Sequence, residues 1–420
     1  MEKAINLALI GHGGRGRSLL RSVLLPLCEE ENLRVTAVCD IYEDRANAAA
    51  DKVVEMGFPR PEVFTDYNET IKHPGLDAVI VPSAWESHIE IAIAAMRQGL
   101  HAAIEVGGAY SVEDCWALVK AHEETGRHCM LLENCCYGRK ELAVLNMYRK
   151  GMLGKIVHCE GGYHHDLRGE ITNGMENRHY RLRNYINRNC ENYPTHELGP
   201  IAKLLDINNG NRLVSLSSFS SASYGLHEFV QGKKGTDSPL ADVDFKQGDV
   251  FTTVIKCQQG QTIVLTLDTS LPCNYSRGFT VRGTKGAFYE DGGYFYLDNV
   301  HNEFRDHPEN LWGNATPILE ENAHDIWKNY KARGGHGGMD WLVCRAFIEA
   351  VKLGVRPPID TYDTATYMSV TALSEQSVAM GGVPVAIPDF TRSKWYRRND
   401  IVDTFFNIDK LEPFADLYQY

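Results

Sequence analysis

The stretch NYPTHELGP, residues 192–200, places a histidine at the start of a sequence with helical spacing. The unperturbed pKa of an imidazole is ~6.5, so His196 is suited to act as a general base near neutral pH. Pro194 restricts the backbone just before it and could fix the approach of the ring. A histidine ahead of a helix can also be purely structural. Other features of the sequence are needed to distinguish between these two roles.

A glycine-rich turn near the N-terminus has the spacing of a dinucleotide-binding motif. Gly11, Gly13 and Gly16 satisfy G-x-G-x-x-G, after an apolar run at 5–10 and before a stretch with helical spacing. A second apolar run ends in Asp40, whose carboxylate can accept hydrogen bonds from the hydroxyls of the adenosine ribose. Because this carboxylate would repel a 2′-phosphate, Asp40 favours NAD over NADP.

Apolar runs and helical stretches alternate through the first third of the chain. Strands are expected at 62–66, 77–83, 101–106 and 128–134, and helices at 43–57, 86–99 and 111–126. This alternation predicts a Rossmann-type α/β domain, with a doubly wound parallel sheet that binds ligands at the carboxyl ends of its strands. The residues at those ends are Gly11–Gly16, Asp40, Pro82–His88, Glu105–Val106 and Glu133–Asn134. The alternative is an α/β domain that binds no nucleotide.

The pattern changes from about Gly154. Strands are expected at 154–166, 212–224, 249–259, 261–270, 279–284, 286–290 and 294–298, and helices at 196–207, 339–354 and 364–380. Strands that follow one another without helices predict an α+β domain with a mostly antiparallel open sheet. The polar, arginine-rich stretch Asp166–Asn192 is expected to be a loop, either over the active site or merely exposed. We therefore expect an NAD-binding domain at 1–135 and a substrate and oligomerisation domain at 136–420.

The composition narrows the range of partners. The chain has 420 residues, 43% of them hydrophobic and 23% charged, which is typical of a globular protein. A net charge of -12 argues against a nucleic-acid surface. No run approaches the ~20 apolar residues that cross a bilayer, and the N-terminus has a poor match to a signal peptide. These features predict a cytoplasmic protein that binds neither nucleic acid nor membrane.

The sequence predicts no metal site. Its eleven cysteines are scattered without a CxxC pair, so reduced and mostly buried thiols are expected. The adjacent Cys135 and Cys136 lack the spacing of a zinc site. His164 and His165 would point to opposite faces of a strand and make a poor metal pair. His336 either reaches the active site or only shapes a turn.

Nine motifs occur in the same order as in a known family. They are GHGGRGR, VPSAWESH, EVGGA, LLENCCYGR, GGYHHDLR, YRLR, NYPTHELGP, NYSRG and GHGGMD. The two-domain layout resembles that of the glucose-fructose oxidoreductase, inositol dehydrogenase and MocA superfamily, and the motifs resemble those of its glycoside hydrolase family 109. This resemblance spans nearly the whole chain. It implies an NAD-dependent glycosidase of the α-N-acetylgalactosaminidase type, and a homo-oligomer (a dimer or larger).

The resemblance also implies two sets of binding residues. It places NAD against the glycine turn and the strand ends, at Gly11, Gly13, Gly14, Arg15, Gly16, Asp40, Trp85, Glu86, Ser87, His88, Glu105, Val106, Asn134 and Tyr193. It places the sugar against Tyr163, Arg181, Tyr193, Pro194, Thr195, His196 and Tyr275, with His196, Tyr163 and Tyr275 as the catalytic candidates.

One departure from the superfamily bears on the chemistry. Ordinary dehydrogenases of this group carry a lysine in a Glu-Lys-Pro motif at the end of the fifth strand, whereas this chain has Glu105-Val106-Gly107. The amine that would move a proton from a sugar hydroxyl is absent. His196 is the best candidate to replace it.

These features predict the cleavage of terminal N-acetylgalactosaminides, or a related hexosaminide, through transient oxidation. NAD would take a hydride from C-3 of the sugar while His196 accepts the hydroxyl proton, and Tyr163 or His196 would then remove the proton from C-2. Elimination of the aglycone, addition of water and return of the hydride would follow. Two alternatives remain: an NAD-dependent sugar or cyclitol dehydrogenase, and a non-catalytic protein that binds NAD or a sugar. The partner expected is a small-molecule glycoside.

Overall fold

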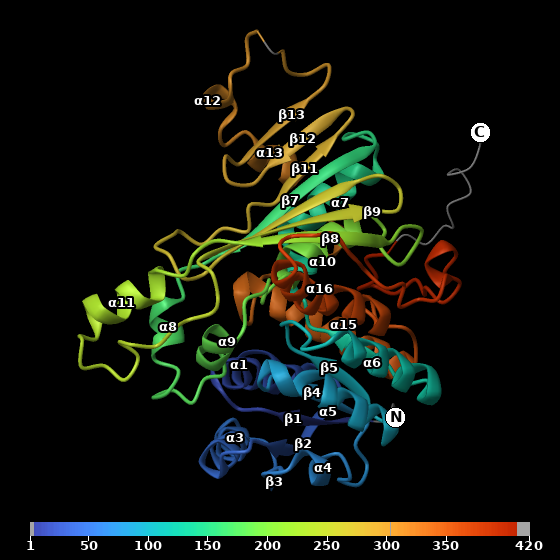
Figure 1. Ribbon diagram of the computed structural model, residues 1–420. Helices are drawn as coiled ribbons and strands as arrows, with labels where there is room; N and C mark the ends of the chain where they lie inside the picture. The colour runs from blue at the N-terminus through green and yellow to red at the C-terminus, as the bar shows by residue number, and fades with distance from the viewer. Residues whose placement is uncertain (1–3, 303, 410–420) are drawn as a thin grey trace. The chain divides into compact units, whose positions relative to one another are not determined.

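The computed structural model describes residues 4–302 and 304–409, which form two compact units (Figure 1). The first unit combines residues 4–137 with two later segments, 329–365 and 398–409. The second unit contains the described residues of 138–328 and 366–397. The chain therefore leaves the first unit twice, after residues 137 and 365, and returns to it each time.

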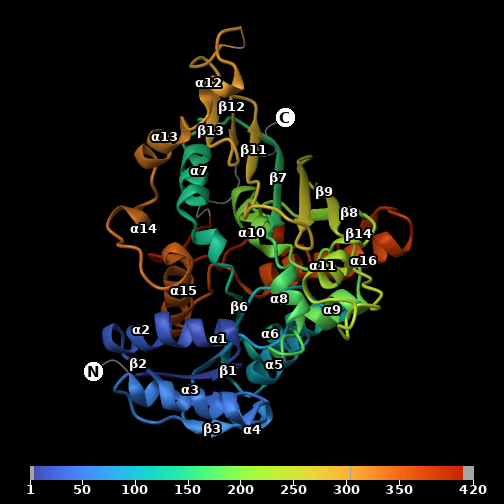
Figure 2. The same ribbon diagram turned by 90° about the vertical axis from the view of Figure 1, so that its left-hand side faces the viewer.

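A six-stranded parallel sheet forms the centre of the first unit, in the order β3-β2-β1-β4-β5-β6. Its strands are β1 (Ile5–Ile10), β2 (Leu33–Cys39), β3 (Glu62–Phe64), β4 (Ala78–Val81), β5 (His101–Ile104) and β6 (Cys129–Leu131). Every residue of β4 and β5 is buried, because helices lie on both faces of the sheet (Figure 2). The predicted Rossmann-type sheet is confirmed.

The first unit contains the helices predicted after the glycine turn and at 43–57, 86–99 and 111–126, together with short helices that were not predicted and with α15 from a later segment. They are α1 (Gly14–Leu19), the π-helical η1 (Leu20–Leu24), α2 (Leu25–Glu30), α3 (Glu43–Glu55), α4 (Tyr67–Thr70), α5 (Trp85–Arg97), α6 (Val112–Thr125), η2 (Asn134–Tyr137), η3 (His336–Gly338) and α15 (Met339–Leu353). The helix after the glycine turn has a wider π turn in its middle. Pro26 explains it, since proline has no N–H to donate and its ring crowds the carbonyl four residues earlier.

An eight-stranded sheet forms the centre of the second unit, in the order β13-β12-β11-β7-β10-β9-β8-β14. Its strands are β7 (Ile156–His164), β8 (Leu213–Ser220), β9 (Val250–Cys257), β10 (Thr262–Asp268), β11 (Thr280–Gly283), β12 (Gly286–Tyr289), β13 (Tyr294–Leu297) and β14 (Val385–Ala386). Neighbouring strands are antiparallel except β7 and β10, which run parallel. The predicted mostly antiparallel sheet is confirmed.

Helix α10 lies against β7 and thereby fixes the start of the histidine segment. A Cβ on Gly161 of β7 would lie only 2.5 Å from the Cβ of Glu197 of α10, so the glycine permits this close approach. The helices of the second unit are α7 (Arg139–Arg149), α8 (Arg168–Thr172), α9 (Arg181–Asn187), α10 (Thr195–Leu204), α11 (Gly225–Lys233), α12 (Pro308–Leu311), α13 (Ala315–Glu321) and α14 (Asp325–Lys328). Helix α16 (Thr361–Ala379) and the short η4 (Lys394–Tyr396) come last.

The stretch Asp166–Asn192, expected to be a loop, contains two helices, α8 and α9. Each is two turns or shorter, which is too short to produce a visible apolar period, and this explains why the prediction was wrong. Within residues 4–302 and 304–409, no helix is long and apolar enough to cross a membrane.

Candidate active site

Close backbone contacts shape the glycine turn between β1 and α1. Gly11 has a φ of 109°, and a Cβ there would lie 2.8 Å from the carbonyl oxygen of Pro82. A Cβ on Gly16 would lie 2.1 Å from the carbonyl oxygen of Gly11. By contrast, a Cβ on Gly14 would have no atom within 4 Å, and one on Gly13 would meet nothing closer than 3.7 Å. This open side at the start of a helix fits the approach of a pyrophosphate.

Asp40 lies directly after β2, where its carboxylate is oriented by two backbone groups. Its Oδ2 accepts the N–H of His12 at 2.7 Å, and its Oδ1 accepts the N–H of Tyr42 at 3.0 Å. A carboxylate has about four acceptor positions, so lone pairs remain for two ribose hydroxyls. Asp40 and the open glycine turn together fit an NAD molecule.

The segment after β4 is braced by a buried histidine. His88 Nε2 lies 3.1 Å from the carbonyl oxygen of Ser83, and burial lowers the pKa of His88 to about 4. The hydroxyl of Ser87 lies 2.8 Å from that of Ser83. His88 is therefore a neutral, enclosed ring that joins the first turn of α5, where the predicted cofactor residues of this segment lie, to the loop that precedes it.

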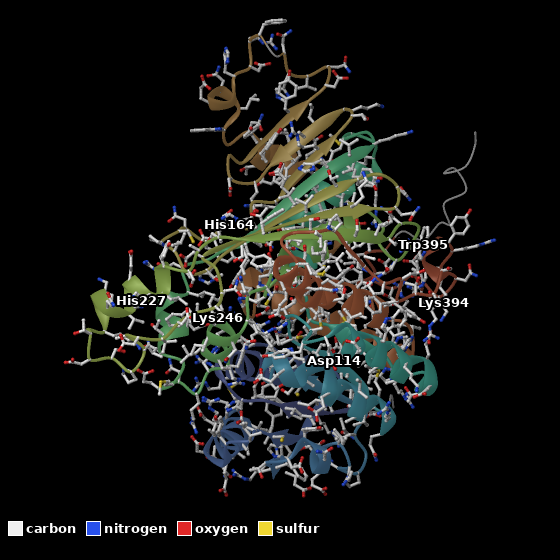
Figure 3. The ribbon with its side chains drawn as sticks, in the orientation of Figure 1. Asp114, His164, His227, Lys246, Lys394 and Trp395 are labelled. Atoms are coloured by element: carbon white, nitrogen blue, oxygen red, sulfur yellow. The ribbon has the colours of Figure 1, made fainter. Side chains whose placement is uncertain are left out.

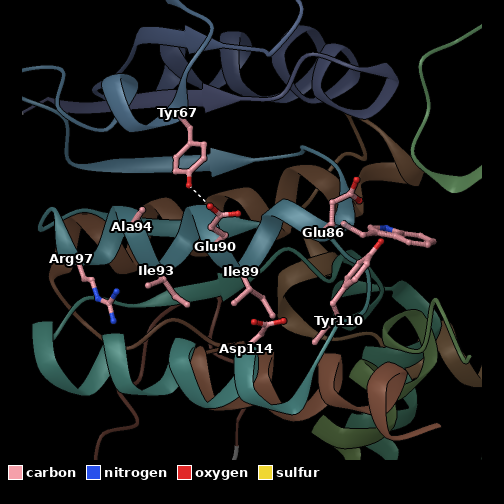
Figure 4. Close-up of a pocket in the computed structure, with 11 residues that line it drawn as sticks. Tyr67, Glu86, Ile89, Glu90, Ile93, Ala94, Arg97, Tyr110 and Asp114 are labelled. Carbon is pink, nitrogen blue, oxygen red and sulfur yellow. Dashed lines mark hydrogen bonds between the residues drawn. The ribbon is translucent and has the colours of Figure 1, made fainter. Parts of the chain in front are cut away.

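Trp85 packs tightly against the residue that follows Val106. A Cβ on Gly107 would lie 2.4 Å from Cδ1 of the Trp85 indole, so any larger residue at 107 would displace the ring. Trp85 and Glu86 line a groove of about 400 Å³ beside α5, together with Tyr110 (Figure 4). The packing of the Trp85 ring therefore explains on steric grounds why position 107 is a glycine.

Arg15 joins three parts of the first unit through its guanidinium group. Its Nε donates to Glu105 Oε1 at 2.7 Å, at the end of β5. Its Nη1 and Nη2 donate to the two carboxylate oxygens of Asp340, on α15, at 2.6 and 2.9 Å. The side chain of Arg15 is thus held by carboxylates, while its backbone remains part of the glycine turn.

Two further side chains bind Asp340. Asn134 Nδ2 donates to Asp340 Oδ1 at 2.7 Å, and His336 Nδ1 lies 2.9 Å from Asp340 Oδ2. Burial opposes ionisation here, but hydrogen bonds from His336 and Arg15 hold the pKa of Asp340 well below its usual range. The motif GHGGMD therefore supplies a buried carboxylate to the cofactor-binding unit, and His336 contacts it.

Five aromatic rings gather in the second unit, around the end of β7 and the start of α10. They are Tyr163, His165, Tyr193, His196 and Tyr275. The His196 ring centroid lies 4.8 Å from that of Tyr193 and 5.4 Å from that of Tyr163. The Tyr163 and Tyr193 centroids are 4.5 Å apart. The predicted catalytic histidine therefore lies among the predicted tyrosines.

His165 belongs to this cluster, although it was not predicted. Its Nδ1 lies 2.9 Å from the hydroxyl of Tyr163, and its ring centroid lies 5.1 Å from that of Tyr275. Burial and then the charge of Arg181 lower the pKa of His165. His164, which ends β7 (Figure 3), has no ring contact of this kind among the described residues.

Arg181 is a buried cation at the edge of the cluster. Its Nε lies 2.8 Å from Glu170 Oε1, and its Cζ lies 5.1 Å from the ring centroid of Tyr193. Burial raises the pKa of Tyr163 to about 12, although the charge of Arg181 opposes the shift. The phenol of Tyr163 is therefore protonated at neutral pH and depends on a neighbour to release its proton.

Pro194 and Thr195 form the entry to α10. Pro194 is the N-cap with a φ of -72°, close to the value that its ring imposes. The Thr195 hydroxyl is buried and has no hydrogen-bond partner among residues 4–302 and 304–409. A buried hydroxyl of this kind fits a site that is completed by a ligand or by water.

Glu191, two residues before Tyr193, is also part of this framework. Its N–H donates to Ser374 Oγ at 2.9 Å, and its carbonyl accepts from Thr371 Oγ1 at 2.6 Å. Burial raises the pKa of the Glu191 carboxyl to about 8, although a hydrogen bond from the Tyr193 N–H opposes the shift. The segment that leads to His196 is thereby tied to α16.

All predicted sugar-binding residues lie in the second unit, and all predicted NAD-binding residues except Tyr193 lie in the first. Sequence reasoning missed His165, Glu191 and Asp340. The first has a detectable signal, since the spacing Tyr-x-His on a strand places both rings on one face. Glu191 and Asp340 have no such signal in the sequence, because their hydrogen-bond partners are far away in the chain.

Two family descriptions together cover most of the chain. Residues 5–132 match the oxidoreductase family with an NAD-binding Rossmann fold, and residues 137–397 match the C-terminal domain of glycosyl hydrolase 109. The predicted cofactor, NAD, is confirmed by the first match.

Similar proteins cover nearly the whole chain. An α-N-acetylgalactosaminidase from Tannerella forsythia is 35% identical, over 94% of this chain and 88% of that protein. A glycosyl hydrolase family 109 protein from Stenotrophomonas maltophilia is 38% identical, over 95% of this chain and 92% of that protein.

A solved structure supports the fold. Levoglucosan dehydrogenase in complex with NADH and levoglucosan has a TM-score of 0.66 and 18% identity, over 92% of this chain and all of the other. At this identity the likeness concerns the fold alone. The two family matches and the curated relatives lead to one conclusion: this chain is a member of glycosyl hydrolase family 109, an NAD-dependent glycosidase family built on an oxidoreductase fold.

Proposed function

We propose that the protein hydrolyses terminal N-acetylgalactosaminides, or a related hexosaminide, by oxidation followed by elimination. When bound, NAD supplies a reversible hydride acceptor for C-3 of the sugar, so the cofactor ends each cycle as it began. A ketone at C-3 acidifies the hydrogen at C-2, which allows the aglycone to leave C-1 before water adds. The name of the relative from Tannerella forsythia supports this class of substrate.

The observation that carries the proposal is the position of His196 among tyrosine rings. The ring lies 4.8 Å from Tyr193 and 5.4 Å from Tyr163 between centroids. Position 106, at which related dehydrogenases carry the lysine, is an apolar valine. His196 would therefore accept the proton of the C-3 hydroxyl, since an imidazole is a competent base near neutral pH.

The contact between Tyr163 and His165 supports Tyr163 as the acceptor of the C-2 proton. The two groups are 2.9 Å apart, so the ring nitrogen of His165 is in place to receive the phenol proton as Tyr163 takes the proton from C-2. Burial and the charge of Arg181 lower the pKa of His165, which favours the neutral form of its ring. His196 is the other candidate for this step. A tyrosine with a high pKa needs such a partner before it can act as a base.

Two further residues would contact the sugar, one as a proton donor and one as a hydrogen-bond donor. Tyr275 is 54% exposed and lies beside His165, so its hydroxyl could donate a proton to the departing oxygen. Arg181, next to Tyr193, would hydrogen-bond to the acetamido carbonyl or a hydroxyl, since a guanidinium offers charged N–H donors.

Proton NMR of the full-length protein with aryl α- and β-N-acetylgalactosaminides in deuterated water tests the proposal. We expect release of the aryl group, deuterium at C-2 of the sugar and no net NADH. His196→Ala should lower the rate of cleavage by about 10²- to 10⁴-fold, the usual contribution of a general base. His227→Ala, on α11 (Figure 3), is the control and should retain the rate, since the hydrogen bond of this ring within residues 4–302 and 304–409 is to Gln231, outside the aromatic cluster.

Two other outcomes would replace the proposal. If the glycosides stay intact while free sugars and NAD yield NADH, the protein is a sugar or cyclitol dehydrogenase. If sugars and NAD bind but neither reaction occurs, it is a non-catalytic binding protein.

A further inference from the structure

The order of the strands separates the two halves of the cofactor site. In a doubly wound sheet, the dinucleotide crosses the point at which the strand order reverses, here between β1 and β4. Asp40, after β2, takes the adenosine half. The nicotinamide half therefore belongs to the side of β4, β5 and β6, where Glu105 and Asn134 follow their strands.

Two carboxylates and one arginine meet on that side, and His336 also contacts one of the carboxylates, Asp340. The guanidinium of Arg15 is shared between Glu105, at 2.7 Å, and Asp340, at 2.6 and 2.9 Å. Asp340 is fully buried, Glu105 has a side-chain exposure of 7%, and Arg15 one of 24%. Two carboxylates thus face one permanent cation in a region with little solvent to screen them.

The hydrogen bonds favour the ionised form of both carboxylates. Glu105 accepts from Arg15 on Oε1 and from the Val106 N–H on Oε2, at 3.2 Å. Asp340 accepts from Arg15 on both oxygens and from Asn134 on Oδ1. Burial and the charge of Asp340 raise the pKa of Glu105, and the adjacent Arg15 charge opposes that shift without cancelling it.

The surplus negative charge acts differently on the two forms of the cofactor. The nicotinamide ring of NAD⁺ carries a positive charge, and that of NADH carries none. We propose that the Glu105–Arg15–Asp340 cluster makes the protein bind NAD⁺ in preference to NADH. The preference suits an enzyme that must start and finish each turnover with NAD⁺, but it rests on NAD binding and not on the proposed glycosidase activity.

The test compares the dissociation constants of NAD⁺ and NADH for the full-length protein stripped of cofactor. NADH is titrated by its fluorescence, and NAD⁺ by displacement of NADH. We expect the wild type to bind NAD⁺ more tightly than NADH. A wild type that prefers NADH would overturn the inference, even if no variant could be prepared.

Two variants locate the effect. Asp340→Asn and Glu105→Gln keep the shape of each side chain but remove one negative charge. Each should raise the ratio of the NAD⁺ to the NADH dissociation constant by about tenfold, the order expected for one charge about 12 Å away at an effective dielectric constant of ~20. A merely structural role would weaken both forms by the same factor and leave the ratio unchanged, which would also overturn the inference.

Glu30→Gln is the matched control. Glu30 also pairs with an arginine of the first unit, Arg333, but both side chains are more than a third exposed. Its replacement should leave the ratio of the two dissociation constants unchanged. If Glu30→Gln raised the ratio of the two dissociation constants by a similar factor, the preference would depend on the net charge of the protein and not on the Glu105–Arg15–Asp340 cluster.

Discussion

The hydroxyl of Tyr163 lies 2.9 Å from Nδ1 of His165. Two residues apart at the end of β7, these side chains share one face and form a phenol–imidazole pair beside His196. Neither group is unusual alone, but the contact gives a tyrosine whose pKa is raised to about 12 a neighbour that can accept its proton.

If the pair acts as one unit, its two members should not contribute independently. Tyr163→Phe and His165→Phe should each lower kcat/KM for an aryl N-acetylgalactosaminide by about 10²-fold or more, and the double variant should lose little beyond that. A double-mutant cycle on kcat/KM measures this coupling. Losses that multiply would show that the two residues act separately.

The glycine turn allows cofactor binding to be separated from folding. Gly14→Ala should leave the melting temperature of the apo-protein nearly unchanged, because a Cβ there meets no atom within 4 Å, but it should weaken NAD⁺ binding by occupying the open side. Gly16→Ala should lower the melting temperature by several degrees, since its Cβ would lie 2.1 Å from a backbone oxygen. Thermal melts and NAD⁺ titrations of both variants check the pair. If Gly14→Ala lowered the melting temperature as much as Gly16→Ala does, the prediction for the glycine turn would be wrong.

Glu191 should make stability fall as pH rises. Its pKa of about 8 in the folded protein exceeds the unfolded value of ~4.3, so between these values the unfolded chain releases a proton that the native state retains. The resulting loss in the free energy of unfolding is ~1.4 kcal/mol per pH unit at most, and it ends above about pH 8. Glu191→Gln should remove this slope and be more stable than the wild type at pH 8.

Urea denaturation at pH 5, 6.5 and 8 measures the slope. Glu228→Gln, which alters an exposed carboxylate on α11, should keep the slope of the wild type. An unchanged slope in Glu191→Gln would mean that Glu191 is already ionised in the folded protein.

His101 should make stability fall as pH drops. Burial, then the charges of Arg127 and His122, lower its pKa to about 4, so the native ring stays neutral while the unfolded ring takes a proton below ~6.5. The unfolded state therefore gains protons first, and the free energy of unfolding decreases from about pH 6.5 toward 4. His101→Gln should flatten this decrease. Melting temperatures between pH 7.5 and 4.5 test it, with His227→Gln as the control.

The pattern of the sequence was sufficient to predict most strands and the longest helices, because each has a period that a single stretch of chain reveals. It gave no prediction for helices α7 and α11 or for strand β14. It failed for α8 and α9, which are too short to show one. The sequence pattern also did not indicate that residues 329–365 belong to the first unit. The apolar stripe of α15 predicts that this helix packs against another element, but not which one.

The candidate site divides in a similar way. His196 and its tyrosines can be predicted because they lie in short motifs with a recognisable family pattern. Asp340 occupies such a motif too, but its partner Arg15 is 325 residues away, and no local rule joins them. Glu191 could not be predicted, because its raised pKa results from burial in the folded protein and not from its neighbours in the sequence.

The return of the chain to its first unit has a consequence for biosynthesis. Residues 4–137 leave the ribosome well before α15 and Asp340, which follow only after about 200 further residues. A domain that emerges first generally folds first. Here the nascent NAD-binding half holds Arg15 and Glu105 without Asp340 until most of the second unit has been made. The part of the protein that is translated first is therefore completed late.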